Sequence, residues 1–227
     1  MNLLALDTST DMASVALSHG EQMDSLEQSS VRQHAQQILP MIQHLLDQAR
    51  LSLSRLDGIV FDSGPGSFTG LRIACSIAKA LAYAHDLPIY SVSSLDAIAY
   101  QARLHMTALQ ESTGILAILD ARMNEVYWAY YPPESRRPER EISVTPAALV
   151  EVPEGCKVVL AGVGLETYDA QWSIAVKAAT QQHYAIAPSA KALIELVQLG
   201  GGAKMRVADA LPIYVRNTVT QTGGPHG

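Results

Sequence analysis

The chain has 227 residues, of which 48% are hydrophobic and 17% charged, a balance that excludes an intrinsically disordered protein. A formal net charge of −6 argues against a protein that holds a nucleic-acid backbone by itself, because such proteins need a basic face. The two cysteines have no metal-like spacing, and no run approaches the roughly 20 apolar residues of a membrane span. The N-terminus has no basic start, so it does not predict a signal peptide, and a cytoplasmic protein is expected.

The first half of the chain alternates short apolar runs, typical of buried strands, with longer helical patterns. Three early strands joined by tight turns predict an antiparallel meander, and the third is polar enough for a sheet edge. The first helix repeats apolar residues every three or four positions, with Pro40 inside the pattern. The expected strands are 3–8, 13–18, 23–28, 58–61, 89–92 and 114–120, and the expected helices are 33–48, 71–85 and 94–104.

The second half is less regular. Strands are expected at 126–131, 158–161 and 211–215, and a short amphipathic helix at 190–199 should stop at the glycines 200–202. A meander followed by alternating helices and strands predicts an α/β protein with helices packed on a mixed sheet.

The segment 64–72, Gly-Pro-Gly-Ser-Phe-Thr-Gly-Leu-Arg, is the most informative part of the chain. Its three glycines permit backbone conformations closed to other residues, and Ser67 or Thr69 could cap the following helix. A glycine loop between a strand and a helix can present amide N–H groups to an anion. No Gly-Lys-Ser/Thr follows, so this is not a Walker phosphate loop. From the residues alone, a structural tight turn is the favoured interpretation.

Several strings together resemble the TsaB (YeaZ) family, in the family's order and over nearly the whole chain. Residues from about 132 to 198 match only loosely. The matching strings are Leu4-Ala5-Leu6-Asp7-Thr8-Ser9-Thr10, His34 with Leu39-Pro40-Met41, the segment 64–72, Asp120-Ala121-Arg122, Glu125-Val126-Tyr127 and Pro212-Ile213-Tyr214-Val215-Arg216.

The resemblance implies an actin/Hsp70/sugar-kinase-like (ASKHA, ribonuclease H-like) fold of two related lobes in a bacterial protein. Residues 1–106 would form an N-terminal lobe with the partner-binding helices. Residues 107–217 would form a smaller, divergent C-terminal lobe, and residues 218–227 a loose tail. The resemblance also implies a part in making threonylcarbamoyladenosine next to the anticodon of tRNA.

The same resemblance assigns the chemistry of that pathway to other proteins. One enzyme makes threonylcarbamoyl-adenylate, and the paralogue TsaD transfers the threonylcarbamoyl group to the adenosine. TsaB-like proteins bind TsaD as a heterodimer, and a small ATPase, TsaE, joins them. The tRNA would be reached indirectly through this complex, and a homodimer of the present chain is also expected to be able to form.

The catalytic paralogue carries a Val-Asn-His-x-x-x-His stretch, which places two metal-binding imidazoles one helical turn apart. The matching place here is residues 92–98, where Ser94 and Ile98 occupy the two histidine positions. Isoleucine cannot ligate a metal and serine is a poor substitute. The resemblance therefore implies an accessory subunit with no catalytic residues, no metal site and no cofactor of its own.

The residues after the first strand, Asp7 to Thr10, place a carboxylate and three hydroxyls in one turn, as at the nucleotide site of actin-like ATPases. The alternative is a hydrogen-bonded turn between strands. Residues 120–122 offer an arginine where a second phosphate loop would need glycines, so a degenerate nucleotide or anion site is expected. ATP or ADP, if bound, would sit at the interface of the complex. The candidate residues are Asp7, Thr8, Ser9, Gly64, Gly66, Ser67, Thr69 and Gly70.

The helices at 33–48 and 71–85 are the expected partner surface, because their outer faces could form a bundle with matching helices of a paralogue. Both could equally be ordinary helices that cover the core. The chain departs from the family just before the glycine motif, where Asp62-Ser63 replaces the expected Gly-Arg. The candidate contact residues are His34, Gln37, Met41, Arg72, Ser76 and Lys79.

Two functions of other classes stay open. A stand-alone actin-like ATPase or small-molecule kinase would need two intact phosphate loops and a catalytic carboxylate, and the sequence does not display them. A metallopeptidase would need metal ligands in a pattern such as His-Glu-x-x-His, which the sequence lacks. Turnover of ATP by the isolated chain would favour the first, and a bound divalent metal would favour the second.

Overall fold

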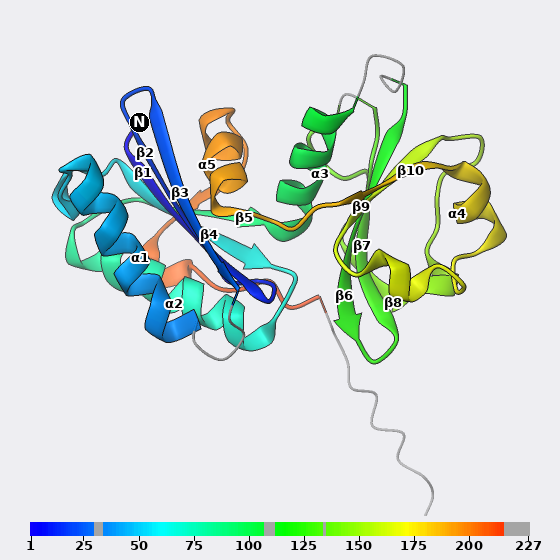
Figure 1. The fold of residues 1–227 in the computed structure, drawn as a ribbon, viewed down its shortest axis with the longest axis horizontal. Coiled ribbons are helices and arrows are strands. Elements are labelled where there is room, and N and C mark those ends of the chain that lie inside the picture. The colour runs from blue at the N-terminus through cyan, green and yellow to red at the C-terminus, as the bar shows by residue number, and fades with distance from the viewer. Residues whose placement is uncertain (30–33, 107–111, 134, 216–227) are drawn as a thin grey trace, which may run out of the picture.

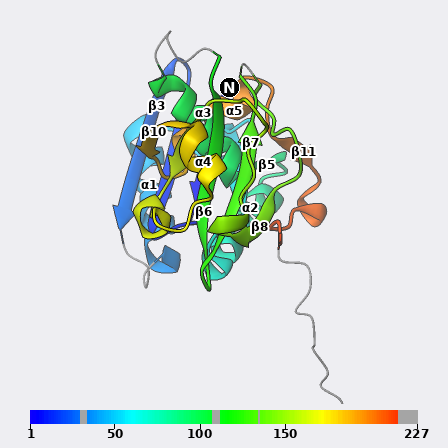
Figure 2. The same cartoon turned by 90° about the vertical axis from the view of Figure 1, so that its right-hand side faces the viewer.

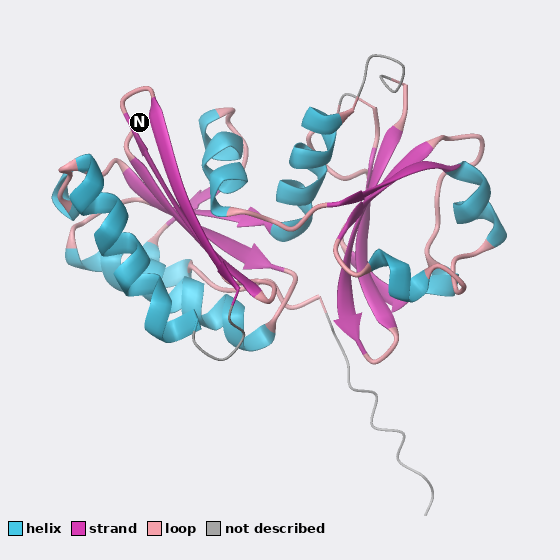
Figure 3. Ribbon diagram, viewed as in Figure 1, coloured by secondary structure: helices cyan, strands magenta, loops and turns pink. Residues whose placement is uncertain are grey.

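The computed structural model describes residues 1–29, 34–106, 112–133 and 135–215. The chain forms two lobes, and each lobe is built on one mixed β-sheet (Figure 1). Helices α3 (Ser94–His105) and α5 (Ala190–Gln198) stand between the two sheets (Figure 3). None of the described helices is both long and apolar enough to cross a bilayer.

The sheet of the first lobe has the strand order β11-β5-β4-β1-β2-β3. The first three strands pair antiparallel, which confirms the predicted meander, and β3 lies at the edge as expected. The strands β1, β4 and β5 run parallel, because helices connect them. The bounds are β1 Leu3–Asp7, β2 Met12–His19, β3 Gln22–Ser29, β4 Gly58–Gly64, β5 Ile89–Ser93 and β11 Ala203–Met205.

Two long helices, α1 (His34–Ala49) and α2 (Phe68–Ala84), cover one face of this sheet. Pro40 lies inside α1, as the sequence predicted. Helix α2 begins at Phe68, three residues earlier than expected, because the Ser67 hydroxyl accepts the N–H of Gly70 and caps the helix. Helix α5 covers the opposite face, so both faces of the sheet are buried.

The second sheet has the order β10-β9-β6-β7-β8, and α3 packs on the face toward the first lobe. Helix α4 (Ile174–Ala179) packs on the outer face, which is turned to the viewer in Figure 2. The strands β8 and β10 and helix α4 were not predicted, because each is short and carries no long hydrophobic period. The bounds are β6 Gly114–Arg122, β7 Glu125–Tyr131, β8 Ser143–Pro146, β9 Val158–Gly162 and β10 Thr180–Ala185.

The end of the described chain returns to the first lobe. Strand β11 pairs antiparallel with β5, and residues 207–215 then run along α2. The strand expected at 211–215 was wrong, because this segment forms no ladder with a sheet; its backbone is joined to β4 by a hydrogen bond from the Ile213 N–H to the Ser63 carbonyl. In space, therefore, α5 and β11 belong to the first sheet although they follow residue 107 in sequence. The tail expected at 218–227 lies outside the described residues.

Candidate functional site

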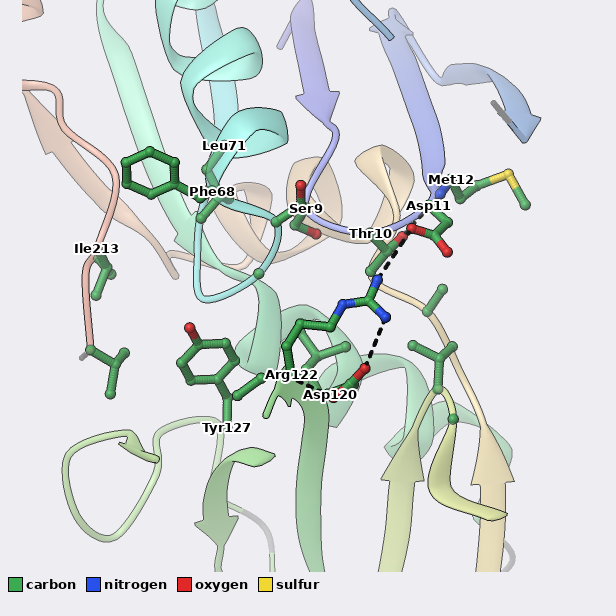
Figure 4. A pocket seen from close by; sticks show the side chains of 18 of the residues that line it. Ser9, Thr10, Asp11, Met12, Phe68, Leu71, Asp120, Arg122, Tyr127 and Ile213 are labelled. Carbon is green, nitrogen blue, oxygen red and sulfur yellow. Dashed lines mark hydrogen bonds and ion pairs between the residues drawn. The ribbon is translucent and has the colours of Figure 1, made fainter. Parts of the chain in front are cut away.

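A cleft of about 950 Å³ lies between the two lobes (Figure 4). The first lobe contributes the turn after β1 and the glycine loop, and the second lobe contributes the β6–β7 hairpin. The returning C-terminal segment closes one side. The lining residues are Ser9, Thr10, Asp11, Met12, Ser29, Gly66, Ser67, Phe68, Leu71, Leu119, Asp120, Ala121, Arg122, Met123, Tyr127, Val163, Gly164, Ala187, Ile213, Tyr214 and Val215.

The glycine loop packs directly against the turn that follows β1. A Cβ on Gly70 would overlap the Thr8 carbonyl oxygen, and a Cβ on Gly66 would overlap that of Ser9. The Thr8 hydroxyl also donates to the Gly70 carbonyl at 2.6 Å. These glycines are therefore required by close backbone contact, which is the structural interpretation favoured from the sequence.

Three of the loop's amide groups are engaged within the protein. The Ser67 N–H donates to the Ser9 carbonyl at 2.6 Å, and the Gly64 N–H donates to Asp62 Oδ1 at 2.7 Å. The N–H of Gly70 donates to the Ser67 hydroxyl at 3.3 Å. An incoming phosphate would have to displace these bonds. The loop is thus built to join α2 to β1 rather than to present a row of free donors.

The expected nucleotide-site residues come together, but they do not all face the cleft. Asp7 and Thr8 are fully buried beneath the glycine loop, and Ser9 reaches the cleft with only 2% of its surface exposed. Gly66 and Ser67 line the cleft, whereas Gly64 is buried and Thr69 is exposed elsewhere. Of the candidate set, Ser9, Gly66 and Ser67 are the cleft-lining members.

A second buried carboxyl, Asp62, lies next to Asp7. Asp7 Oδ1 accepts the N–H of Ser9 at 2.8 Å, and Asp62 Oδ1 accepts the Ser94 hydroxyl at 2.6 Å. Burial raises the pKa of Asp7 well above its ordinary value, and the charge of Asp62 raises it further. Burial also raises the pKa of Asp62, although bonds from Ser94 and Gly64 oppose that rise. Sequence inspection missed this pair because Asp62 lies 55 residues from Asp7 in the chain.

Arg122 brings positive charge into the cleft from the second lobe. Its guanidinium lies 3.3 Å from Asp120 and 3.9 Å from Asp11 of the first lobe (Figure 4). Residues Arg122, Met123 and Asn124 all have positive φ, so the hairpin turns sharply at this point. Asp120 also accepts a hydrogen bond from the Tyr168 hydroxyl at 2.7 Å, which fixes its carboxylate beside the cleft.

The two positions that match the paralogue's histidines are both in the core. Ser94 begins α3, and its hydroxyl is committed to Asp62. Ile98 is fully buried and packs against the second sheet. Among the described residues, no group of three or more His, Cys, Asp or Glu side chains is arranged to hold a metal ion.

The candidate partner residues on α1 and α2 have different surroundings. Met41 is only 6% exposed and belongs to the core, whereas Ser76 is exposed and Gln37 is half-buried. Arg72 and Lys79 contact the returning C-terminal segment. The Arg72 guanidinium stacks on Phe68 at 3.7 Å and donates to the Tyr214 hydroxyl, while the Lys79 ammonium donates to two backbone carbonyls. The His34 side chain lies outside the described part of the structure.

Comparison with known proteins gives close matches over the whole fold. The model of the family TsaD, tRNA N6-adenosine threonylcarbamoyltransferase, matches residues 27–208. The tRNA threonylcarbamoyladenosine biosynthesis protein TsaB of Haemophilus influenzae is 34% identical over 97% of this chain and 95% of its own length. The protein of the same name from Escherichia coli is 42% identical over 58% of this chain and 55% of its own.

Solved structures agree with these sequence matches. YeaZ from Pseudomonas aeruginosa superposes with a TM-score of 0.82 at 36% identity, and covers 94% of this chain and 99% of its own. A second P. aeruginosa structure, described as an uncharacterized protein with similarity to peptidase YEAZ, gives the same score and identity over 95% of this chain and 99% of its own. These matches, with the two mixed sheets, confirm the predicted two-lobed, actin-like α/β fold. The chain therefore belongs to the TsaB (YeaZ) family.

Proposed function

We propose that this chain is a non-catalytic, cytoplasmic subunit of the complex that transfers a threonylcarbamoyl group to the adenosine next to the anticodon of tRNA. In this proposal the chain binds and supports a TsaD-like catalytic paralogue, and a TsaE-like ATPase joins them. The tRNA is reached through the complex, which agrees with the chain's net charge of −6.

The observation that carries the proposal is the whole-length match to a protein named for tRNA threonylcarbamoyladenosine biosynthesis. A likeness confined to one lobe would support only the fold. Here the match spans 97% of the chain and 95% of the relative's own length. The role in the same modification is therefore the function that the chain's similarity favours.

The non-catalytic part of the proposal rests on Ser94 and Ile98. The Ser94 hydroxyl is bonded to Asp62, and Ile98 contributes a hydrocarbon side chain to the core. Neither can replace an imidazole as a metal ligand. Three of the glycine-loop amides, those of Gly64, Ser67 and Gly70, are also bonded internally, which weakens the case for a stand-alone ATPase or kinase. ATP or ADP, if present, is proposed to lie at the interface of the complex.

The partner surface is proposed on the outer faces of α1 and α2, within the proposed 1–106 lobe. These helices lie side by side on the side of the first sheet away from the second lobe (Figure 1). Their exposed apolar side chains include Leu39, 54% exposed, and Tyr83, 82% exposed. Exposed aromatic and aliphatic side chains of this kind serve as anchors at protein interfaces. The proposed partner surface also includes five polar candidates, His34, Gln37, Arg72, Ser76 and Lys79. Met41 is proposed to pack in the core beneath this surface.

The test is reconstitution of tRNA threonylcarbamoylation from purified components, with and without this chain, alongside the chain alone. We expect product only when this chain and the metal-binding paralogue are both present. Equal product in the absence of this chain would refute the proposal. Turnover of ATP by the isolated chain would instead favour the hypothesis of a stand-alone ATPase.

The partner surface has its own test in a pair of matched variants. Tyr83→Asp places a charge on α2, whereas Ile174→Asp makes the same kind of change on α4 of the second lobe, where Ile174 is 88% exposed. We expect Tyr83→Asp to weaken binding of the paralogue at least tenfold, about 1.4 kcal/mol, in calorimetry. Ile174→Asp should bind as wild type. Equal affinity of both variants for the paralogue would show that the interface does not include the outer face of α2.

A further inference from the structure

The ends of β1 and β4 carry two carboxyl groups, Asp7 and Asp62, that the proposed function does not use. The two strands are parallel neighbours, and their register pairs Leu6 with Phe61. The next residues along each strand are Asp7 and Asp62, so the two side chains follow the strands at the same level. Both residues have no exposed surface at all. A pair of acids is thus enclosed directly beneath the glycine loop.

One oxygen of each carboxyl is fully used. Asp7 Oδ1 accepts the Ser9 N–H, and Asp62 Oδ1 accepts the Gly64 N–H and the Ser94 hydroxyl. The other oxygens, Asp7 Oδ2 and Asp62 Oδ2, lie beside the buried Ser9 hydroxyl, whose single proton can serve only one of them. Two ionised carboxylates would leave at least one of these oxygens without a hydrogen bond, which buried polar atoms rarely tolerate.

Among the described residues, no positively charged group acts on the pair. The groups that act on it from β1, β4, the turn after β1, the glycine loop and the start of α3 are the two carboxyls themselves, Ser9, Gly64 and Ser94. All but the acids are uncharged. Two buried negative charges without a cation would repel each other and lose their hydration, which strongly favours retention of a proton.

We propose that Asp7 and Asp62 share one proton at neutral pH and so form a single-proton site beneath the floor of the cleft. The proton lies between Asp7 Oδ2 and Asp62 Oδ2, where it turns two unsatisfied acceptors into a donor and an acceptor. This bond joins β1 to β4. Through Ser9, whose carbonyl accepts the Ser67 N–H, the pair also supports the loop that lines the cleft.

The direction of the pKa shifts supports this arrangement, since both acids have pKa values raised above the ordinary range. The unfolded chain releases these protons near pH 4, whereas the folded chain keeps one of them at higher pH. A carboxyl with a raised folded-state pKa contributes stability below the unfolded value, and that contribution is lost as the pH rises toward the folded value. Stability should therefore fall with pH above about 4.

The experiment measures the unfolding equilibrium in urea between pH 6 and 8 for wild type, Asp62→Asn and Asp7→Asn. An asparagine supplies its own N–H to the remaining carboxylate, so no proton is needed. We expect the ratio of the wild-type to the variant unfolding constant to rise about tenfold per pH unit. Asp86→Asn, at an exposed position of positive φ that asparagine accepts, is the control and should track wild type. A ratio that does not change with pH would overturn the proposal.

A second measurement uses wild type alone, in case the asparagine variants do not fold. The ¹³Cγ signals of aspartates in uniformly labelled protein report carboxyl ionisation, and we expect one carboxyl proton to persist above pH 7. Two fully ionised signals for Asp7 and Asp62 at pH 7 would refute the shared proton. Stabilisation of wild type by millimolar Mg²⁺ or Ca²⁺, absent in Asp62→Asn, would likewise refute it by showing that a cation fills the site.

Discussion

The two lobes have the same plan, a mixed sheet between helices, but they differ in the number of polar residues that they bury. The first lobe buries a chain of them at the ends of β1, β4 and β5, among them Asp7, Thr8, Ser9, Asp62 and Ser94. In the described part of residues 112–186, Thr113 is the one buried polar residue apart from tyrosine and tryptophan. The core of the second lobe is otherwise hydrocarbon with aromatic rings.

This difference indicates which lobe should tolerate fewer substitutions in its core. A buried polar group must keep its partners in place, because an unsatisfied donor or acceptor costs about 1–3 kcal/mol. A hydrocarbon core accepts other side chains of similar volume at lower cost. Most of the strings by which the family is recognised lie in the first lobe, and two of them, residues 120–122 and 125–127, lie on β6 and β7 of the second. The following changes test this contrast, from the largest effect to the smallest.

Gly70→Ala should have the largest effect. The added methyl group would overlap the Thr8 carbonyl oxygen, and backbone atoms on both sides cannot move freely. We expect a loss of about 3 kcal/mol in the free energy of unfolding, measured by urea denaturation. The control is Gly155→Ala in the second lobe, where no atom lies within 4 Å but φ is +73°. That change should lower the free energy of unfolding by only about 1 kcal/mol, through backbone strain. Equal losses for the two variants would contradict the expected difference between the lobes.

Tyr131→Phe tests the main polar contact of the second lobe. The Tyr131 ring is fully buried, and its hydroxyl donates to Asp96 Oδ1 of α3 at 2.7 Å. Removal of this donor should lower the free energy of unfolding by about 2 kcal/mol, because the acceptor is a carboxylate. Tyr83→Phe, at an exposed position, should change stability by less than about 0.5 kcal/mol in the same assay. An equally small change at Tyr131 would show that water replaces the lost donor.

Arg122→Gln should have the smallest effect on stability. The Arg122 side chain is 76% exposed, and its ion pairs with Asp11 and Asp120 are open to solvent. Exposed ion pairs contribute little, so we expect a change below about 0.5 kcal/mol in urea denaturation. Added salt should not widen the difference between variant and wild type. A loss above 1 kcal/mol would mean that this contact between the lobes contributes more to the fold than its exposure suggests.

The sequence predicted the first lobe more fully than the second, for a physical reason. The strands at 3–7 and 58–64 begin with continuous apolar runs, at 3–6 and 59–61, and the helix at 34–49 has a clear period, so local pattern and tertiary environment agree. In the second lobe, β8 and α4 have only four and six residues, too few for a period to emerge. The strand expected at 211–215 failed because this segment joins no sheet; Leu211 and Ile213 are exposed, and Tyr214 contacts the Phe68 ring at the start of α2.

The residues of the candidate site were likewise predicted only in part from the sequence. The turn at Asp7–Ser9 and the glycine loop were identified from sequence, and the structure brings them into contact. The sequence could not show that Asp7 and Thr8 face inward, that Asp62 stands beside Asp7, or that Tyr214 reaches Arg72. Each of these depends on residues at least 55 positions apart, which only the folded chain brings together.

By itself, then, the sequence determined the family, the two-lobed fold and the glycine-loop junction, because these depend on contiguous motifs and periodic apolar residues. The tertiary structure alone decided which of the motif residues line the cleft and which are buried beneath it. It also decided that α5 and β11 return to the first sheet, and that two acids from different strands meet with no basic side chain of the described residues acting on them. Burial and pairing are properties of segments brought together across the chain, and for that reason local sequence does not encode them.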